Sequence, residues 1–124
     1  MNWMNVKHFT AKEFACKCGN CGGAEDMNPE FMTLLDEMRD RLNRPMTITS
    51  GYRCREHPEE AKKALPGAHN QGTAADIAVS GGSERFEIIS IALEVGMLGL
   101  GVANSFVHVD LGHETTTRPM AWKY

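Results

Sequence analysis

The chain lacks a long hydrophobic run and any large excess of charge. No apolar stretch in its 124 residues approaches the roughly 20 that span a bilayer, so we expect no membrane insertion. A net charge of -3 gives no electrostatic reason to expect nucleic acid as a partner. The polar first residues also lack the apolar core of a secretory signal, so the chain is expected to be cytoplasmic as synthesised.

Internal repeats, low-complexity stretches and linkers are also missing. A chain of 124 residues that is 42% hydrophobic can close one core but has little material for two. We therefore expect a single domain over residues 1–124, with a cysteine-rich knuckle at about 14–24, and a monomer.

Cysteine is scarce but clustered. Cys16, Cys18 and Cys21 lie close together beside several glycines, and Cys54 follows further along the chain. In a reducing compartment such a set indicates a metal site sooner than disulfides, and four thiolates could close a tetrahedral structural zinc site. Buried free thiols, or one disulfide from Cys54 to the cluster, remain the alternatives.

Helices are predicted by capping signals and apolar spacing. Thr10 and Glu13 form a capping box that predicts a short helix, and the spacing after Asn28 and Pro29 predicts a longer one over about 29–43. A helical turn is possible at 58–64. Another helix should begin at a Ser83 cap and end at Gly96. The apolar stripe that we expect it to turn toward the core consists of Phe86, Ile88, Ile89 and Leu93.

Strands are predicted where β-branched or apolar residues alternate between turn signals. The predicted strands are 46–49, 74–79, 98–102 and 106–111, and the last two could pair as a hairpin. The order helix, strand, strand, helix, strand, strand favours an α+β fold with helices packed on a small, largely antiparallel sheet.

Two segments carry candidate metal ligands. In the first, His69 and Asp76 bracket Gly72, which permits a close approach of the backbone, and two small alanines. In the second, alternation along 106–110 puts His108 and Asp110 on one face of an otherwise apolar strand. Polar groups on such a face need partners, and two histidines with one carboxylate leave a fourth position for water, as in a catalytic zinc site.

At these residues the chain resembles the M15-type metallopeptidases, which include zinc D-alanyl-D-alanine carboxypeptidases, D,D-dipeptidases and phage L-alanyl-D-glutamate endolysins. The resemblance covers most of the chain. It rests on Ser50-Gly51-Tyr52-Arg53, on the HxxGxAxD pattern from His69 to Asp76, and on the strand 106–110. Hedgehog signalling domains share a similar fold and zinc pattern, so the fold by itself does not establish activity.

The resemblance implies a role for each site residue. His69, Asp76 and His108 are the expected zinc ligands, and Arg53 is the expected cation near the scissile carbonyl. Many relatives place an acid three residues before the last histidine, where this chain has Ser105. Asp110 could replace it as general base or could instead orient His108. The candidate substrate contacts are Ser50, Tyr52 and His113.

The expected function is therefore a zinc-dependent peptidase that hydrolyses peptidoglycan stem peptides containing D-amino acids, as a carboxypeptidase or an endopeptidase. A phage or prophage lysis product, released to the cell wall by a partner such as a holin, fits the family. The alternative is a non-catalytic zinc-containing module of the same fold, which binds the wall or belongs to a phage structure. The serine at position 105 keeps this alternative open.

Overall fold

The computed structural model describes residues 1–18, 21, 23–63, 67–113 and 116–124. Residues 19, 20 and 22 of the predicted knuckle, and residue 64 of the predicted turn, lie outside this set. The helices are η1 (Trp3–Asn5), α1 (Ala11–Phe14), η2 (Gly23–Asp26), α2 (Pro29–Leu42), α3 (Pro58–Ala61) and α4 (Gly82–Val95). The strands are β1 (Ile48–Ser50), β2 (Ala74–Ala78), β3 (Gly99–Val102), β4 (Phe106–Asp110) and β5 (Met120–Lys123).

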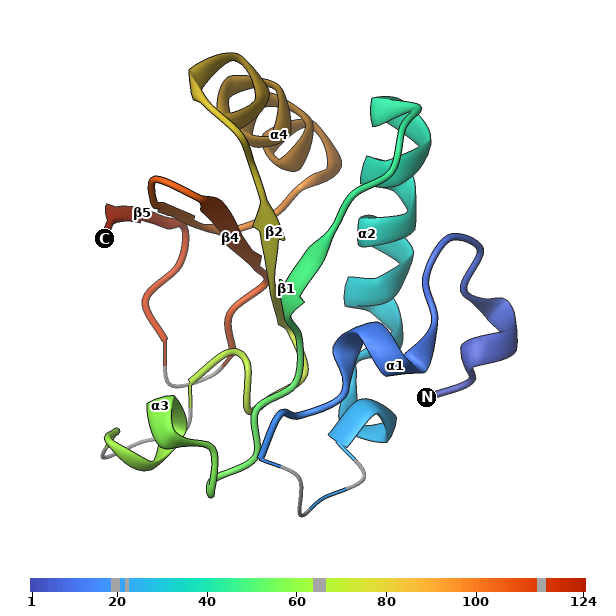
Figure 1. The fold of residues 1–124 in the computed structure, drawn as a ribbon, viewed down its shortest axis with the longest axis vertical. Helices are drawn as coiled ribbons and strands as arrows, with labels where there is room; N and C mark the ends of the chain where they lie inside the picture. Colours follow the sequence, from blue (N-terminus) through green and yellow to red (C-terminus); the bar gives the residue numbers. More distant parts are fainter. Residues whose placement is uncertain (19–20, 22, 64–66, 114–115) are drawn as a thin grey trace.

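The strands form one sheet in the order β1-β2-β4-β3-β5. All neighbours are antiparallel except β3 and β5, which run parallel. Helices α2 and α4 pack against each other beside the sheet, whereas α3 and the long loops lie toward its other end (Figure 1). The predicted α+β fold with a largely antiparallel sheet is confirmed. No helix among the described residues is both long and apolar enough to cross a membrane.

The hydrophobic core and the polar site lie on opposite faces of β2 and β4. Ile77, Val107 and Val109 have no exposed surface and belong to the core cluster that includes the apolar residues of α2 and α4. The intervening residues Asp76 and His108 face the other way, as the alternation predicts. The central strands therefore present rigidly held polar side chains on one face.

The long helix α2 follows its sequence signals closely. The side chain of Asn28 accepts a hydrogen bond from the backbone N–H of Phe31 at 3.0 Å, and Asn43 ends the helix in a left-handed conformation. Helix α4 ends at Gly96 as predicted, but it begins after Gly81 rather than at a Ser83 cap. Gly81 is the residue that precedes the first turn, and its φ of 90° is accessible to glycine but strained for other residues, so the helix can begin directly after it.

The apolar stripe predicted for α4 is wrong in part. Phe86 is 74% exposed and Leu93 is 59% exposed, whereas the buried residues of the helix are Ile88, Ile91 and Ala92. The helix therefore rests on a narrower seam of i, i+3, i+4 residues than its composition suggests.

Two strand predictions also need correction. Strand β1 begins at Ile48 rather than at Met46, and β5 was not predicted at all. Strand β5 runs parallel to β3, with Trp122 opposite Gly101. Trp122 is half-buried at this sheet edge and packs the tail onto the body. The sheet consequently continues past β3 and brings the tail next to the polar face.

Candidate metal centre

Strand pairing brings two of the predicted ligands together. Asp76 on β2 and His108 on β4 are direct partners in the antiparallel register, so their side chains project from the same face. Both side chains are buried, with Asp76 5% and His108 4% exposed. The sheet itself therefore fixes the distance between this carboxylate and this imidazole.

The third side chain, His69, comes from the loop that leads into β2. This loop turns at Gly72, which has a φ of 74° and whose carbonyl accepts a hydrogen bond from the N–H of Asn28 at 2.9 Å. A Cβ atom at Gly72 would collide with the backbone oxygen of Asp26. The predicted need for glycine at this position is thus explained by a close backbone approach that directs His69 back over the sheet.

The donor atoms of these three residues, here called the histidine–aspartate cluster, converge on one point. His69 Nε2 lies 3.2 Å from His108 Nδ1, and both lie close to Asp76 Oδ1, at 3.3 and 3.0 Å. A tetrahedral zinc site with bonds of 2.0–2.1 Å has ligand atoms roughly 3.3 Å apart. The three atoms already have the spacing of one face of such a tetrahedron.

The outer nitrogens of both imidazoles fix their tautomers. His69 Nδ1 lies 2.7 Å from the carbonyl oxygen of Gly51, which can only accept, so the proton of a neutral ring is on Nδ1. His108 Nε2 lies 2.6 Å from Asp110 Oδ2 and donates to it in the same way. When both rings are neutral, as metal binding requires, the inner nitrogens carry lone pairs directed at the point to which Asp76 also directs an oxygen; without a metal, a proton on either ring is shared with Asp76. A divalent cation satisfies three such convergent acceptors, so the residues fit a zinc ion.

Charge and burial act against each other in this cluster. Burial raises the pKa of Asp76, but hydrogen bonds from His108 and His69 outweigh it and hold that pKa well below its usual range. Burial lowers the pKa of His69. For His108, burial also lowers the pKa, but hydrogen bonds to Asp110 and Asp76 prevail and raise it. Asp76 is thus ionised and ready to bind a cation.

Asp110 lies behind His108 and is engaged at both oxygens. Its Oδ1 accepts from Arg118 Nε and its Oδ2 from Arg118 Nη2, each at 2.7 Å, in addition to the bond with His108. Burial raises the pKa of Asp110, but the hydrogen bonds from Arg118 and His108 lower it to about 2. Gly99 on β3 makes room for the pair, since a Cβ there would overlap the carboxylate. Of the two roles considered for Asp110, these contacts favour the orientation of His108.

Arg53 approaches the cluster from the side of β1. Its Nη2 donates to Asp76 Oδ2 at 3.2 Å and its Nε donates to Ser50 Oγ at 3.1 Å. The backbone of Arg53 is held as well, because its N–H donates to the carbonyl of His69 at 3.2 Å. The guanidinium is therefore aimed at the same carboxylate that faces the two histidines.

A cleft of about 370 Å³ opens beside these residues. It is lined by Arg53, His69 and His108, together with Trp122 and Tyr124 of the tail. The ring of Trp122 lies 5.1 Å from that of His108. The cleft therefore gives a ligand access to the histidine–aspartate cluster between the β1 turn and the C-terminal strand.

The predicted substrate contacts are not among the described residues that line this cleft. Ser50 holds Arg53, as described above. Tyr52 packs against the hydrophobic core, and burial raises its pKa. His113 follows β4, and its backbone N–H donates to Thr116 Oγ1 at 2.9 Å.

Ser105 lies just outside the strand that carries His108. It is exposed in the turn before β4, and its carbonyl accepts from the N–H of Val79 at 2.9 Å. Ser105 precedes His108 by three positions, and it is not among the described residues that line the cleft.

Two supporting residues were missed by sequence reasoning. Arg118 reaches Asp110 only because β5 pairs with β3, and no local pattern marks it. Glu60 on α3 has no exposed surface and accepts from the N–H of Gly67 at 2.7 Å and from Arg55 Nη1 at 3.1 Å. Its fully buried carboxylate anchors the start of the loop that carries His69.

Comparison with known proteins adds a family to this geometry. The model of the family described as Peptidase M15 matches residues 7–110. The chain belongs to the Peptidase M15 family. No curated protein matches it. Membership supports a zinc peptidase type of function in general, with peptides as substrates. The resemblance inferred from the sequence motifs is thus confirmed, and the match spans the whole histidine–aspartate cluster.

Proposed function

We propose that this protein is a zinc-dependent peptidase that hydrolyses peptidoglycan stem peptides containing D-amino acids, with the ion held by His69, Asp76 and His108. The observation that carries the proposal is the convergence of two imidazole nitrogens and one carboxylate oxygen at 3.0–3.3 Å beside an open cleft. A zinc ion bound there would polarise a peptide carbonyl and activate a water molecule.

The protein's own groups would then hold the reactants and balance charge. Arg53 lines the cleft and can donate to the oxygen of the scissile carbonyl as negative charge develops on it. Its bond to Ser50 keeps the guanidinium extended toward the cleft, so we assign Ser50 a positioning role. Among the residues first considered for substrate binding, Tyr52 and His113 are better placed to support the surrounding backbone than to contact a peptide.

Asp110 is proposed to orient His108 rather than to remove a proton. Its carboxylate lies at the wall of the cleft, but it is buried and both of its oxygens are engaged by His108 and Arg118. A carboxylate behind a ligand histidine fixes the ring and increases its basicity. The proton of the attacking water must then pass to another group in the cleft, where Glu59 contributes an exposed carboxylate.

A cell-wall substrate is the finer part of the proposal. Family membership supports peptides in general, and the motif resemblance supports stem peptides with D-amino acids, cut by a carboxypeptidase or an endopeptidase. Action in phage lysis, after release by a holin or a similar partner, agrees with this substrate. The cleft is bounded by aromatic side chains of the tail, which suit a short extended peptide.

The second candidate is a non-catalytic zinc module that binds wall peptides without cutting them. Position 105 favours it, because the acid common in relatives is replaced by a serine that is not among the described residues lining the cleft. Both candidates require the metal and the cleft. They differ only in whether the bound peptide is hydrolysed.

Digestion of purified peptidoglycan separates the two. Zinc-loaded protein should release new termini that mass spectrometry assigns to one type of bond, and a chelator should abolish the release. The matched variants are His69→Ala, which removes a ligand, and His8→Ala, which removes an exposed histidine that pairs with Asp40. Retained binding of wall peptide without any new terminus would favour the non-catalytic module.

A further inference from the structure

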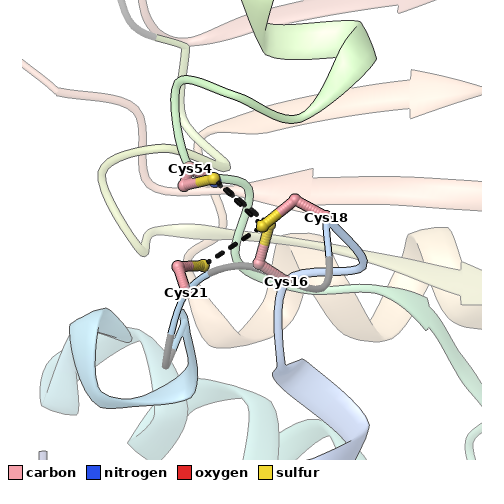
Figure 2. A group of neighbouring side chains, drawn as sticks. All are labelled: Cys16, Cys18, Cys21 and Cys54. Carbon is pink, nitrogen blue, oxygen red and sulfur yellow. Dashed lines mark hydrogen bonds between the residues drawn. The ribbon is translucent and has the colours of Figure 1, made fainter.

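A second group of four side chains, here called the cysteine cluster, gathers sulfur atoms from two distant segments. Cys16, Cys18 and Cys21 follow α1, and Cys54 follows the turn after β1. Figure 2 shows the four side chains pointing toward one another across the gap between these segments. The four Sγ atoms all lie within 4.8 Å of one another.

The spacing of the sulfur atoms is that of a tetrahedral site. The Sγ–Sγ distances are 3.4 Å for Cys54 and Cys18, 3.5 Å for Cys18 and Cys21, and 3.7 Å for Cys16 and Cys54. A zinc ion with four Zn–S bonds of 2.3 Å separates its sulfurs by roughly 3.8 Å. A disulfide would require about 2.05 Å. The four atoms thus approach the edges of a ZnS₄ tetrahedron and are too far apart for a disulfide.

Hydrophobic burial does not explain the gathering. Cys16 is buried, Cys18 and Cys54 are half-buried, and Cys21 is exposed. A core thiol contributes by being buried, and a cluster that runs from the interior to the surface gains little in this way. The backbone N–H of Cys54 also donates to Cys16 Sγ at 3.3 Å. A backbone donor directed at sulfur stabilises a thiolate, the form that binds metal.

We propose that Cys16, Cys18, Cys21 and Cys54 hold a second zinc ion, which is structural. Four sulfur ligands complete the tetrahedron and leave no position for water or substrate. Binding displaces the thiol protons to solvent, so the site forms with release of protons. The inference is independent of the proposed peptidase function, because it concerns a separate set of ligands.

This ion would tie the amino-terminal segment to the turn that supports the histidine–aspartate cluster. Cys54 directly follows Arg53, and the carbonyl of Gly51 three residues earlier accepts the hydrogen bond from His69 Nδ1. The N–H of Tyr52, between them, donates to the carbonyl of Phe14 at 2.9 Å. A metal bound by Cys54 and the other three cysteines would therefore link the same two segments a second time, just beyond this hydrogen bond.

Metal analysis of reduced, folded protein tests the proposal. Wild type should carry one zinc more than a double variant with Cys18→Ser and Cys21→Ser, whereas Lys17→Ala, between two of the ligands, should keep the full content. His69→Ala should lose the zinc ion of the histidine–aspartate cluster and keep the one bound by the cysteine cluster. Equal zinc content in wild type and the double variant would overturn the assignment.

Cobalt substitution gives a readout that needs neither activity nor a cysteine variant. Wild type and His69→Ala loaded with Co²⁺ should both show thiolate-to-cobalt charge-transfer absorption, which nitrogen and oxygen ligands do not produce. Zinc should also protect all four thiols from alkylation in the native protein. Absence of the charge-transfer bands, full alkylation in the presence of zinc, or a disulfide found within the cluster would each contradict the proposal, whatever the protein does to wall peptides.

Discussion

The histidine–aspartate cluster and the cysteine cluster are built in opposite ways. The first is buried, takes two residues from paired strands and one from the loop before β2, has nitrogen and oxygen donors, and faces a cleft. The second joins two loop segments, has sulfur donors, and reaches from the interior to the surface. With a bound zinc ion, the first would leave a coordination position toward the cleft, whereas the second would be closed by its own ligands. The difference suggests a division of roles within one fold: the paired strands hold the candidate reactive site, and the cysteine cluster would hold together the loop segments beside it.

Removal of a ligand from the first cluster should have the largest effect. His108→Ala takes away one of three donors on a strand that cannot rearrange, so we expect loss of the zinc at this site and no detectable hydrolysis. The zinc of the cysteine cluster should remain. Metal analysis together with peptide hydrolysis checks this, and retention of both zinc equivalents in the variant would contradict the ligand assignment.

Arg53→Ala should reduce turnover while both metals stay bound. Loss of one donor to a developing oxyanion typically lowers kcat by about 10²–10³. Because Arg53 also contacts Asp76 Oδ2, kcat should be measured at saturating zinc. Arg53→Lys keeps the charge and should recover part of the rate. An unchanged kcat in Arg53→Ala would show that Arg53 has no role in catalysis and only stabilises the turn after β1.

Asp110→Asn separates the two roles considered for this carboxylate. If it orients His108, zinc affinity should fall by about 10–100-fold and excess zinc should restore most activity. If it were the general base, kcat would fall by about 10²–10⁴ and added metal would not help. We expect the first result. Arg118→Gln, which frees the carboxylate from its ion pair, should show a weaker form of the same affinity loss.

Glu60→Gln should have the smallest effect, on stability alone. Burial raises the pKa of Glu60, but the hydrogen bond from the Gly67 N–H and the nearby Lys63 lower it overall. A carboxylate whose pKa is lowered by folding contributes stability above its ordinary value of 4.5, and this contribution disappears as the pH falls through the lowered pKa.

We therefore expect Glu60→Gln to lower the free energy of unfolding by about 1 kcal/mol near pH 7, since it keeps an acceptor for Gly67 but loses the charge. The difference from wild type should shrink as the pH falls from the ordinary value of 4.5 through the lowered pKa of Glu60. Urea denaturation at several pH values measures it. A difference that grew in acid would show that the ionised carboxylate is not the stabilising form.

The sequence predicted those features that depend on local periodicity. Alternation along Phe106–Asp110 was enough to put His108 and Asp110 on one face and Val107 and Val109 on the other, because a strand has only two faces. The structure then shows that the valines face the core. Gly72 likewise signalled a close approach of the backbone. These signals operate within a few residues, so no knowledge of the tertiary structure was needed.

Features that depend on distant pairing could not be predicted in this way. Strand β5 is short, and it becomes a strand because β3 offers a free edge next to Gly101. The role of Asp110 depends on Arg118, which that pairing brings within 2.7 Å. The exposure of Phe86 depends on which seam of α4 meets α2 and the sheet. In each case the deciding neighbour is remote in sequence and carries no local pattern.

Titration of metal-free protein with zinc, followed by hydrolysis of a stem peptide, tests the central claim most directly. For wild type, the rate should be absent without metal and rise to saturation as zinc is added, with defined new termini in mass spectrometry. Asp76→Ala, which keeps the cysteine cluster intact, should stay inactive over the same range. Fully zinc-loaded wild type that cleaves no wall peptide, or an Asp76→Ala variant with the wild-type titration curve, would contradict the account.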